Sequence, residues 1–266
     1  MPELSIIIPW CDRPELRATL QHNIPEFSRP DLEVILVNCG GDQHALATLL
    51  CEARVPRLRL ASVPDCKFNK PLALNLGAHH AQGTELFVLD ADILLPAGTL
   101  TGIRASLAPG SFVTVERVVE SVSAQRVEGP YIQEIAYKLE FIGPAGRSVL
   151  LEMSRTRFTD GSRGAPGLIL LARADFLQVN GMNSQLEGWG WEDLDLIARL
   201  ELGLDLRRLN VGSAIHLTHQ VPPQASAKAD RASSERLNFS RCLNNYLAGN
   251  LLGTYREDVA RWADRC

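Results

Sequence analysis

The sequence predicts an α/β fold with a mostly parallel central sheet flanked by helices. Along the first third of the chain, short apolar runs alternate with helical patterns, and polar or glycine-rich residues follow each run. Alternation of this kind implies parallel strands joined by right-handed crossovers. The polar ends of the strands then meet at one edge of the sheet, where open α/β sheets bind their ligands.

Four apolar runs are the predicted strands, because short apolar segments flanked by polar sequence are typical of buried strands. They cover residues 6–8, 34–37, 58–63 and 86–89. The residues that follow them are Pro9, Asn38 to Gly41, Pro64-Asp65 and Asp90.

Helical patterns separate these strands at residues 14–22, 43–53 and 71–81. Proline in the first turn of the third helix favours that start, since the proline lacks an N–H that would have no partner there. Further along, an apolar stripe predicts a helix that begins near Trp191. Residues 230–247 have an amphipathic pattern, which suits either a cover over a binding site or a homodimer contact. Residues 152–167, rich in Arg, Gly and Ser, predict a long mobile loop.

Asp90 and Asp92 follow the fourth predicted strand at positions i and i+2. Both carboxylates can turn toward one point beyond the carboxyl end of the strand. Two oxygen donors there suit Mg²⁺ or Mn²⁺, and such a cation could bind a diphosphate. A solvated turn is the alternative, because a single Asp-x-Asp also occurs by chance.

Composition narrows the class of protein. The chain has 266 residues and a net charge of -4, and it shows no basic stripe, which argues against nucleic acid as a partner. Six cysteines without a Cys-x-x-Cys pair predict reduced thiols. We find no signal peptide and no apolar run near the roughly 20 residues of a membrane helix. We therefore expect a cytoplasmic protein, with a peripheral place on the inner membrane face as an alternative.

Three motifs carry a resemblance to a known family. They are Ser5-Ile6-Ile7-Ile8-Pro9, then Asp90-Ala91-Asp92, and then Asn180-Gly181-Met182 followed by Gly188-Trp189-Gly190-Trp191-Glu192-Asp193-Leu194-Asp195. Together they resemble the GT-A glycosyltransferases, especially the inverting, family-two-like enzymes that use nucleotide sugars. The last motif is similar to the acceptor-side motif of the β-1,4-galactosyltransferases and the bacterial chondroitin-type polymerases. The resemblance runs from about Ser5 to Gln220.

The resemblance implies one GT-A domain over residues 1–266, with a Rossmann-like sheet. Residues 1–110 would bind the nucleotide sugar and metal, residues 111–225 the acceptor, and residues 226–266 would form a helical extension. The implied reaction transfers a sugar from a nucleotide sugar, expected to be a UDP-sugar, to a hydroxyl of a glycan, glycolipid or other acceptor. It would require Mn²⁺ or Mg²⁺ and invert the anomeric configuration.

The resemblance also assigns roles on the acceptor side. Asp193 would be the general base, while Trp189, Gly190 and Glu192 would bind the acceptor. The alternative is that the acidic residues only complement the dipole of the helix that starts there. Asp195 lies about 200° around the helix from Asp193 and should face elsewhere.

For the metal, the resemblance implies Asp90, Asp92 and a histidine. His219 is the expected third ligand, and His216 is a second candidate because some relatives use two ligands three residues apart. A strand that carries one surface histidine is the alternative for this segment.

The resemblance assigns nine residues to binding of the nucleotide sugar. They are Pro9, Asp12, Arg13, Asn38, Asn69, Lys70, Asn75, Asp90 and Ala91. Many relatives carry Asp-Asp-Gly-Ser where this chain has Asn38 to Gly41, a departure that leaves the identity of the base open. Asn38 could still bond uracil through its amide. For Asp12 the alternative is a helix cap.

Other functions remain as alternatives. A retaining GT-A enzyme would not need Asp193, and a non-catalytic nucleotide-sugar-binding module would show no turnover. A nucleotidyltransferase would carry a Gly-rich, Lys/Arg-containing loop after the first strand, and residues 9–13 lack it. The segment from Arg155 to Arg163 is expected either to close over the diphosphate or to be an ordinary surface loop.

Overall fold

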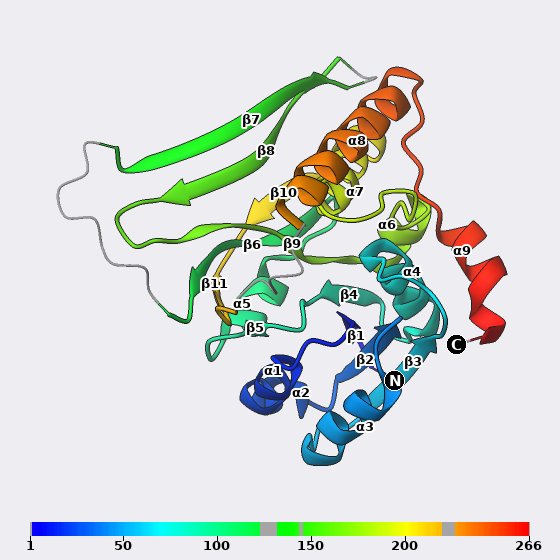
Figure 1. Cartoon of the computed structure of the whole chain (residues 1–266). Helices are drawn as coiled ribbons and strands as arrows, with labels where there is room; N and C mark the ends of the chain where they lie inside the picture. Colours follow the sequence, from blue (N-terminus) through cyan, green and yellow to red (C-terminus); the bar gives the residue numbers. More distant parts are fainter. Residues whose placement is uncertain (1, 123–131, 144–145, 220–226, 266) are drawn as a thin grey trace.

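The computed structural model describes residues 2–122, 132–143, 146–219 and 227–265 (Figure 1). The strands are β1 Leu4–Trp10, β2 Leu32–Cys39, β3 Leu58–Val63, β4 Glu85–Val88, β5 Ile93–Leu94, β6 Ser111–Glu120, β7 Glu134–Ile142, β8 Ser148–Arg157, β9 Arg163–Ala172, β10 Arg207–Asn210 and β11 Ser213–His216. The helices are α1 Leu16–His22, α2 Ile24–Phe27, α3 Gln43–Glu52, α4 Lys70–His80, α5 Thr99–Ser106, α6 Arg173–Gln178, α7 Glu192–Gly203, α8 Ala227–Leu247 and α9 Tyr255–Trp262, with a 3₁₀ turn at Ala263–Arg265. The predicted α/β class is confirmed.

The N-terminal part of the sheet is parallel, in the order β3-β2-β1-β4. Side chains of β1 alternate between its two faces, as the period of a strand requires. Ile7 packs with helices α4 and α7 on one face, whereas Ile6 and Ile8 pack with α1, α2, α3 and α5 on the other. Both faces are therefore covered, and the ligand-binding edge of the sheet is left at the carboxyl ends of the strands.

The sheet continues into a mixed half. Strand β9 runs antiparallel to β4 and β6, while β10 and β11 run parallel to β6. Strand β11 also pairs antiparallel with β5, which follows the Asp-x-Asp segment. This pairing brings the histidines at the end of β11 to the acidic turn after β4.

Strands β7 and β8 form a hairpin that extends from the body of the molecule (Figure 1). Here the predicted mobile loop over residues 152–167 is wrong, because most of it lies in β8 and β9. Its arginines pair with carboxylates of neighbouring strands: Arg157 with Glu116 at 3.0 Å and Glu134 at 2.8 Å, and Arg163 with Glu120 at 3.3 Å. The arginine-rich composition thus reflects cross-strand ion pairs.

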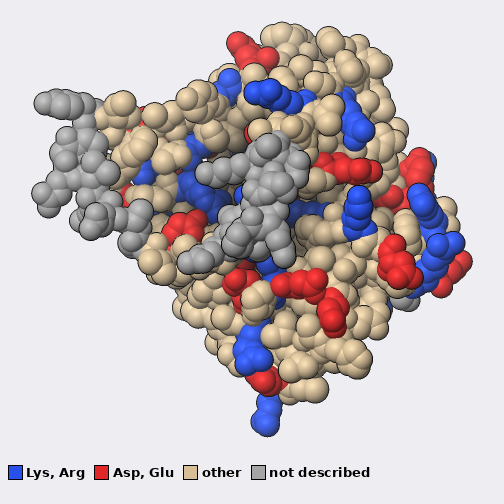
Figure 2. Space-filling view, in the orientation of Figure 1, with Lys and Arg blue, Asp and Glu red and all other residues tan. Residues whose placement is uncertain are grey.

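Charged side chains of both signs and free cysteines occur among the described residues. Figure 2 shows acidic and basic side chains interspersed on the face that it presents. The cysteines at positions 11, 39, 51, 66 and 242 are free thiols. No helix in the described part of the chain is long and apolar enough to cross a membrane.

Candidate active site

Lys70 brings together two carboxylates from distant parts of the sequence. Asn69 caps helix α4 by accepting a hydrogen bond from the Leu72 N–H at 2.9 Å, so Lys70 is the first residue of the helix. Its Nζ lies 2.9 Å from Asp90 Oδ1 and 3.1 Å from Asp193 Oδ2. Burial alone would lower the pKa of Lys70, but the charges of Asp193 and Asp90 outweigh it and raise the pKa. The ammonium group therefore stays charged between the two carboxylates.

Helix α7 begins at Glu192, close to the predicted start, and places three carboxylates in its first turn. Trp191 precedes it in the left-handed backbone region at φ 74° and packs against Phe239 of α8. This buried tryptophan fixes where the helix starts. Burial, followed by the charge of Asp193, raises the pKa of Glu192 to about 7. Near neutral pH Glu192 can therefore donate a hydrogen bond as well as accept one.

The two carboxylate oxygens of Asp193 differ in their hydrogen bonding. Oδ2 accepts a hydrogen bond from Lys70, whereas Oδ1 is buried with no hydrogen-bond partner in the described ranges of the chain. Gly167 of β9 makes room for this pair, because a Cβ added there would lie 2.5 Å from Asp193 Oδ2 and 3.1 Å from Lys70 Nζ. Nothing in the local sequence around Gly167 distinguishes it from other strand glycines, so its role could not be predicted from the sequence.

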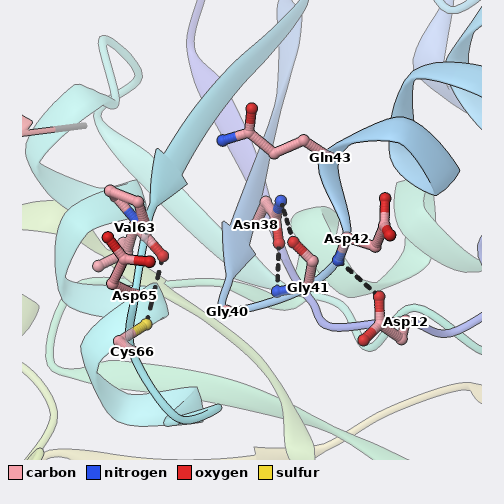
Figure 3. A pocket seen from close by; sticks show the side chains of 10 residues that line it. Asp12, Asn38, Gly40, Gly41, Asp42, Gln43, Val63, Asp65 and Cys66 are labelled. Atoms are coloured by element: carbon pink, nitrogen blue, oxygen red, sulfur yellow. Dashed lines mark hydrogen bonds between the residues drawn. The ribbon is translucent and has the colours of Figure 1, made fainter.

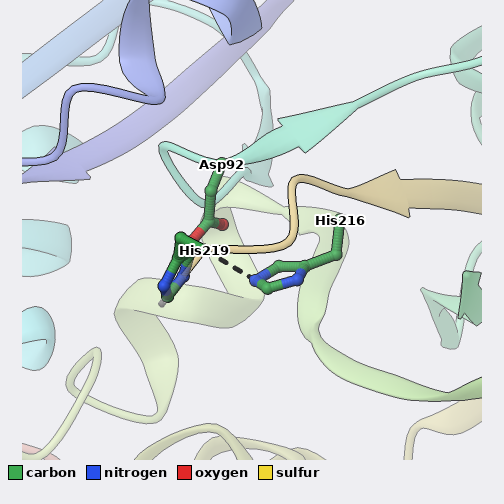
Figure 4. Close-up of side chains that lie close together, drawn as sticks. All are labelled: Asp92, His216 and His219. Carbon is green, nitrogen blue, oxygen red and sulfur yellow. Dashed lines mark hydrogen bonds and ion pairs between the residues drawn. The ribbon is translucent and has the colours of Figure 1, made fainter. Parts of the chain in front are cut away.

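A second cluster joins Asp92 with both candidate histidines (Figure 4). The Nε2 atoms of His216 and His219 lie 3.4 Å and 3.2 Å from Asp92 Oδ2. Burial alone would raise the pKa of Asp92, but the hydrogen bond to His216 and the charges of the surrounding cations lower it. The structure thus brings together three of the four predicted metal-binding residues.

Asp90 is the fourth, and its carboxylate contacts Lys70 in this structure rather than the histidines. The donor set of Asp92, His216 and His219 suits a first-row divalent cation such as Mn²⁺. It suits Mg²⁺ less well, because Mg²⁺ prefers oxygen ligands. The residues present therefore fit an Asp/His metal site.

Glu120, at the end of β6, orients one of these imidazoles. Its Oε2 lies 2.8 Å from His216 Nδ1 and accepts a hydrogen bond from Thr218 Oγ1 at 3.0 Å. A hydrogen bond to Nδ1 leaves Nε2 of His216 facing Asp92, as outer carboxylates do at many metal sites. Only the pairing of β6 with β11 brings Glu120 near His216, so this contact could not be predicted from the sequence.

Arg13 completes the cluster on the side of the first strand. Its Nη1 lies 3.2 Å from His219 Nδ1. The side chain of Arg13 thus joins the segment that follows β1 to the segment that follows β11. A guanidinium beside a candidate metal site is well placed to bind a phosphate.

A cavity of about 540 Å³ lies at the carboxyl ends of β2 and β3 (Figure 3). Asp12, Asp42 and Asp65 line it together with Asn38 and the following glycines. The Asn38 amide is engaged with Gly41: its Nδ2 donates to the Gly41 carbonyl at 3.0 Å, and its Oδ1 accepts from the Gly41 N–H at 2.9 Å. These bonds shape the loop, and the carboxylate oxygens around the cavity are groups that can accept hydrogen bonds from hydroxyl or N–H groups of a ligand.

Three residues assigned to the nucleotide lie elsewhere. Asn75 is fully buried, and its amide bonds Met182 and Asp258, so the prediction that it contacts the nucleotide is wrong. Pro9 is buried inside β1. Asn69 caps α4 and donates to the Ser184 carbonyl at 2.8 Å, so its side chain joins two loops and faces a different cavity.

Ala91 and Trp189 support the site in different ways. The Ala91 carbonyl accepts a hydrogen bond from the buried Thr19 hydroxyl at 2.8 Å, which fixes the turn between Asp90 and Asp92. Trp189 is 50% exposed, and the Arg231 guanidinium lies 5.7 Å from its ring centroid. Gly190 has φ 96° and passes close to Glu235, which lets the backbone turn between Trp189 and α7.

The fold matches solved glycosyltransferase structures. TarS of S. aureus, in the form covering residues 1–349, aligns with a TM-score of 0.53 at 12% identity, over 82% of this chain and 60% of that one. A mannosyltransferase from Pyrobaculum calidifontis, PcManGT, solved with GDP-Man and Mn²⁺, aligns with a TM-score of 0.53 at 17% identity, over 100% of this chain and 76% of that one. The fold is therefore GT-A, as predicted.

Sequence relatives point to the same class of enzyme. Chondroitin sulfate N-acetylgalactosaminyltransferase 2 of Mus musculus is 27% identical over 228 residues, which is 82% of this chain and 40% of the relative. The O-antigen biosynthesis protein RfbC of Myxococcus xanthus is 36% identical over 93 residues, which is 35% of this chain and 7% of that protein. Residues 147–220 match the family described as the N-terminal domain of galactosyltransferase. In sequence and in fold, the chain is therefore similar to glycosyltransferases.

The segment that matches this family, residues 147–220, contains Gly167, Asp193, His216 and His219. The chain spans about 40% of the length of the chondroitin relatives that it matches. The comparison therefore concerns this domain and not the whole of those proteins.

Proposed function

We propose that this domain is a metal-dependent, inverting glycosyltransferase that moves a sugar from a UDP-sugar to an acceptor hydroxyl, with Asp193 as the general base. The observation that carries the proposal is the divided role of the Asp193 carboxylate: Lys70 holds Oδ2, and the buried Oδ1 has no partner among the described residues. An oriented carboxylate with one oxygen that has no hydrogen-bond partner is suited to act as a general base.

In the proposed reaction, the acceptor hydroxyl gives its proton to Asp193 Oδ1 while its oxygen attacks the anomeric carbon. The bond between that carbon and the diphosphate oxygen breaks, and its electron pair leaves with the nucleoside diphosphate. Because attack and departure are on opposite faces of the sugar, the configuration inverts. Lys70 keeps the Asp193 carboxylate oriented during this step, and Glu192 bonds the acceptor.

Asp92, His216 and His219 would hold the cation, with Asp90 close by, and Arg13 would bind the diphosphate from the other side. When bound, a divalent cation stabilises the negative charge that develops on the departing diphosphate. Mn²⁺ is the proposed ion because imidazole and carboxylate ligands are mixed here. The similar mannosyltransferase solved with Mn²⁺ supports this choice.

The nucleotide would occupy the 540 Å³ cavity, with Asp12, Asn38, Asp42 and Asp65 around the ribose and base. Uracil is proposed because it is small and offers an N–H to these acceptors. Since PcManGT was solved with GDP-Man, guanine is the competing base, and a direct comparison decides between them.

The test is a panel of UDP- and GDP-sugars screened for Mn²⁺-dependent hydrolysis, followed by transfer to oligosaccharide acceptors. We expect turnover with a UDP-sugar, loss of turnover on chelation of the metal, and a product of inverted configuration by NMR. Asp92→Asn should abolish Mn²⁺-dependent UDP binding in a folded protein. A product of retained configuration, or binding of UDP without turnover of any donor, would overturn the inverting assignment.

A further inference from the structure

A second cavity, of about 810 Å³, is lined in part by residues that directly precede Lys70 and the start of α7 in the sequence. The loop at Lys67–Asn69, the segment from Ser184 to Trp189, helix α8 and helix α9 enclose it. Its lining includes the aromatic side chains of Phe68, Trp189 and Trp262, and the first two are 44% and 50% exposed. Exposed aromatic rings in such a cavity offer flat apolar surfaces of the kind that stack against sugar rings.

The same cavity gathers four cations: Lys67, Arg231, Arg241 and Arg261. None of them makes an ion pair with a carboxylate that the structure describes. Several arginines elsewhere in the fold do pair with carboxylates; Arg104, for example, contacts Glu3, Asp31 and Glu85. Like charges concentrated without counter-charges favour the binding of an anion from outside.

The two carboxylates in the lining do not supply that counter-charge. Asp258 is buried and accepts hydrogen bonds from Asn75, Ser184 and Thr254, at 2.7, 2.7 and 2.9 Å. Glu187 is exposed and pairs with no described cation.

The guanidinium groups are held beside the aromatic rings. Arg231 lies over Trp189, and the Arg261 guanidinium lies 5.2 Å from the Trp262 ring centroid. Arg241 donates a hydrogen bond to the Gln185 carbonyl, which anchors it to the segment that precedes Trp189. A ring stacked on tryptophan would thus have fork-shaped donors within reach of an acidic substituent.

The position of the cavity relates it to the acceptor. Lys67 to Asn69 lead directly into Lys70, which contacts Asp193, and Trp189 lies four residues before that base. Among the residues that the structure describes, none lines both this cavity and the nucleotide cavity. The second cavity therefore opens next to the base without overlapping the proposed donor site.

We propose that this cavity is an acceptor subsite for an anionic saccharide, with a sugar ring stacked on Trp189 and its carboxylate or phosphate bound by Arg231, Arg241 and Arg261. The proposal rests on the proposed function in that it names the class of acceptor. The binding step itself requires neither metal nor donor, so it can be tested separately.

The experiment measures binding to the full chain, without metal or nucleotide, by calorimetry and tryptophan fluorescence. The probes are tetragalacturonate for a carboxylate source, inositol hexakisphosphate for a phosphate source, and maltotetraose as the neutral saccharide. We expect one of the anionic probes to bind and maltotetraose to bind at least about tenfold more weakly, since a hydrogen bond to a charged group is typically worth that factor or more. The anionic probe that binds more tightly identifies the source.

Matched variants separate a specific site from general charge attraction. Arg231→Gln and Arg261→Gln should each weaken anion binding about tenfold or more. Arg236→Gln on α8 and Arg256→Gln on α9 remove the same charge from exposed side chains that do not line the cavity, and they should bind like the wild type. Equal losses in both pairs, equal binding of maltotetraose, or no binding of either anion would overturn the subsite. None of these outcomes depends on Asp193 or on the metal cluster, so they leave the proposed reaction to its own test.

Discussion

Lys70 Nζ lies 3.1 Å from Asp193 Oδ2, although 123 positions separate the two residues in the sequence. The ion pair connects the first residue of α4 to the first turn of α7, and both helices pack on the same face of the sheet. The other carboxylate oxygen, Asp193 Oδ1, has no hydrogen-bond partner among the described residues.

Asp193→Asn keeps the shape of the side chain but cannot accept a proton. We expect it to reduce transfer by roughly 10²-fold or more while the affinity for UDP and Mn²⁺ stays near wild type. Single-turnover kinetics with calorimetry measure both quantities. Asp205→Asn makes the same chemical change at an exposed position, and comparable turnover in the two variants would remove Asp193 from the mechanism.

Asp195→Asn should act on stability instead. Asp195 is 1% exposed, accepts a hydrogen bond from Arg199 Nε at 2.8 Å, and accepts another from the Tyr246 hydroxyl at 2.9 Å. Removing one charge of a buried pair typically costs about 3–5 kcal/mol. We expect a correspondingly lower free energy of unfolding in urea. An unchanged urea midpoint would show that Arg199 finds other partners.

Gly167→Ala should damage catalysis without unfolding the domain. The added methyl group would lie 2.5 Å from Asp193 Oδ2, so the Lys70–Asp193 pair must move. Displacement of a catalytic group by about 1 Å can cost on the order of 10²-fold in rate. Gly164→Ala in the same strand is the control, since its nearest neighbour would be Arg155 Cβ at 3.6 Å. Equal rates in the two variants would contradict the prediction.

Glu120→Gln should weaken metal binding. Because Glu120 holds His216 Nδ1 at 2.8 Å, its loss frees the imidazole to rotate. Outer partners of this kind typically contribute about 10–100-fold in metal affinity. The measurement is the Kd for Mn²⁺ in the presence of UDP. Glu116→Gln, four residues earlier in β6 and paired with Arg157, is the control and should keep wild-type affinity; a loss there as large as in Glu120→Gln would indicate general charge effects.

Glu201→Gln should change how stability depends on pH. Burial raises the pKa of Glu201 from 4.5 to about 7, and Oε2 has no hydrogen-bond partner in the described segments. The folded chain thus binds this proton more tightly than the unfolded chain, so stability falls as the pH rises from about 4.5 to about 7. Glutamine does not titrate, so the stability of the variant does not fall over this pH range for this reason. We expect a higher Tm than wild type near pH 8 and no gain near pH 5; an equal gain at both would contradict this assignment.

Local patterns in the sequence determined the elements of this protein. The apolar runs that became β1 to β4, the acidic residues after β4, and the start of α7 near Trp191 could all be predicted. Hydrophobic periodicity and helix-end preferences depend on residues a few positions apart, so a short stretch of sequence is enough to predict where these strands and helices lie.

Tertiary packing decided which groups meet. Asn75 fits a nucleotide contact by sequence position, but the packing of α4 against Met182 and Asp258 buries its amide. Arg157 lies in a segment with the composition of a loop, yet its carboxylate partners come from β6 and β7. Asp90 contacts Lys70 because α4 packs on the parallel part of the sheet, and Glu120 contacts His216 only because β6 and β11 pair in a particular register. Each of these contacts joins residues tens of positions apart, and such distances are set by how complete elements pack rather than by the residues beside each side chain in the sequence.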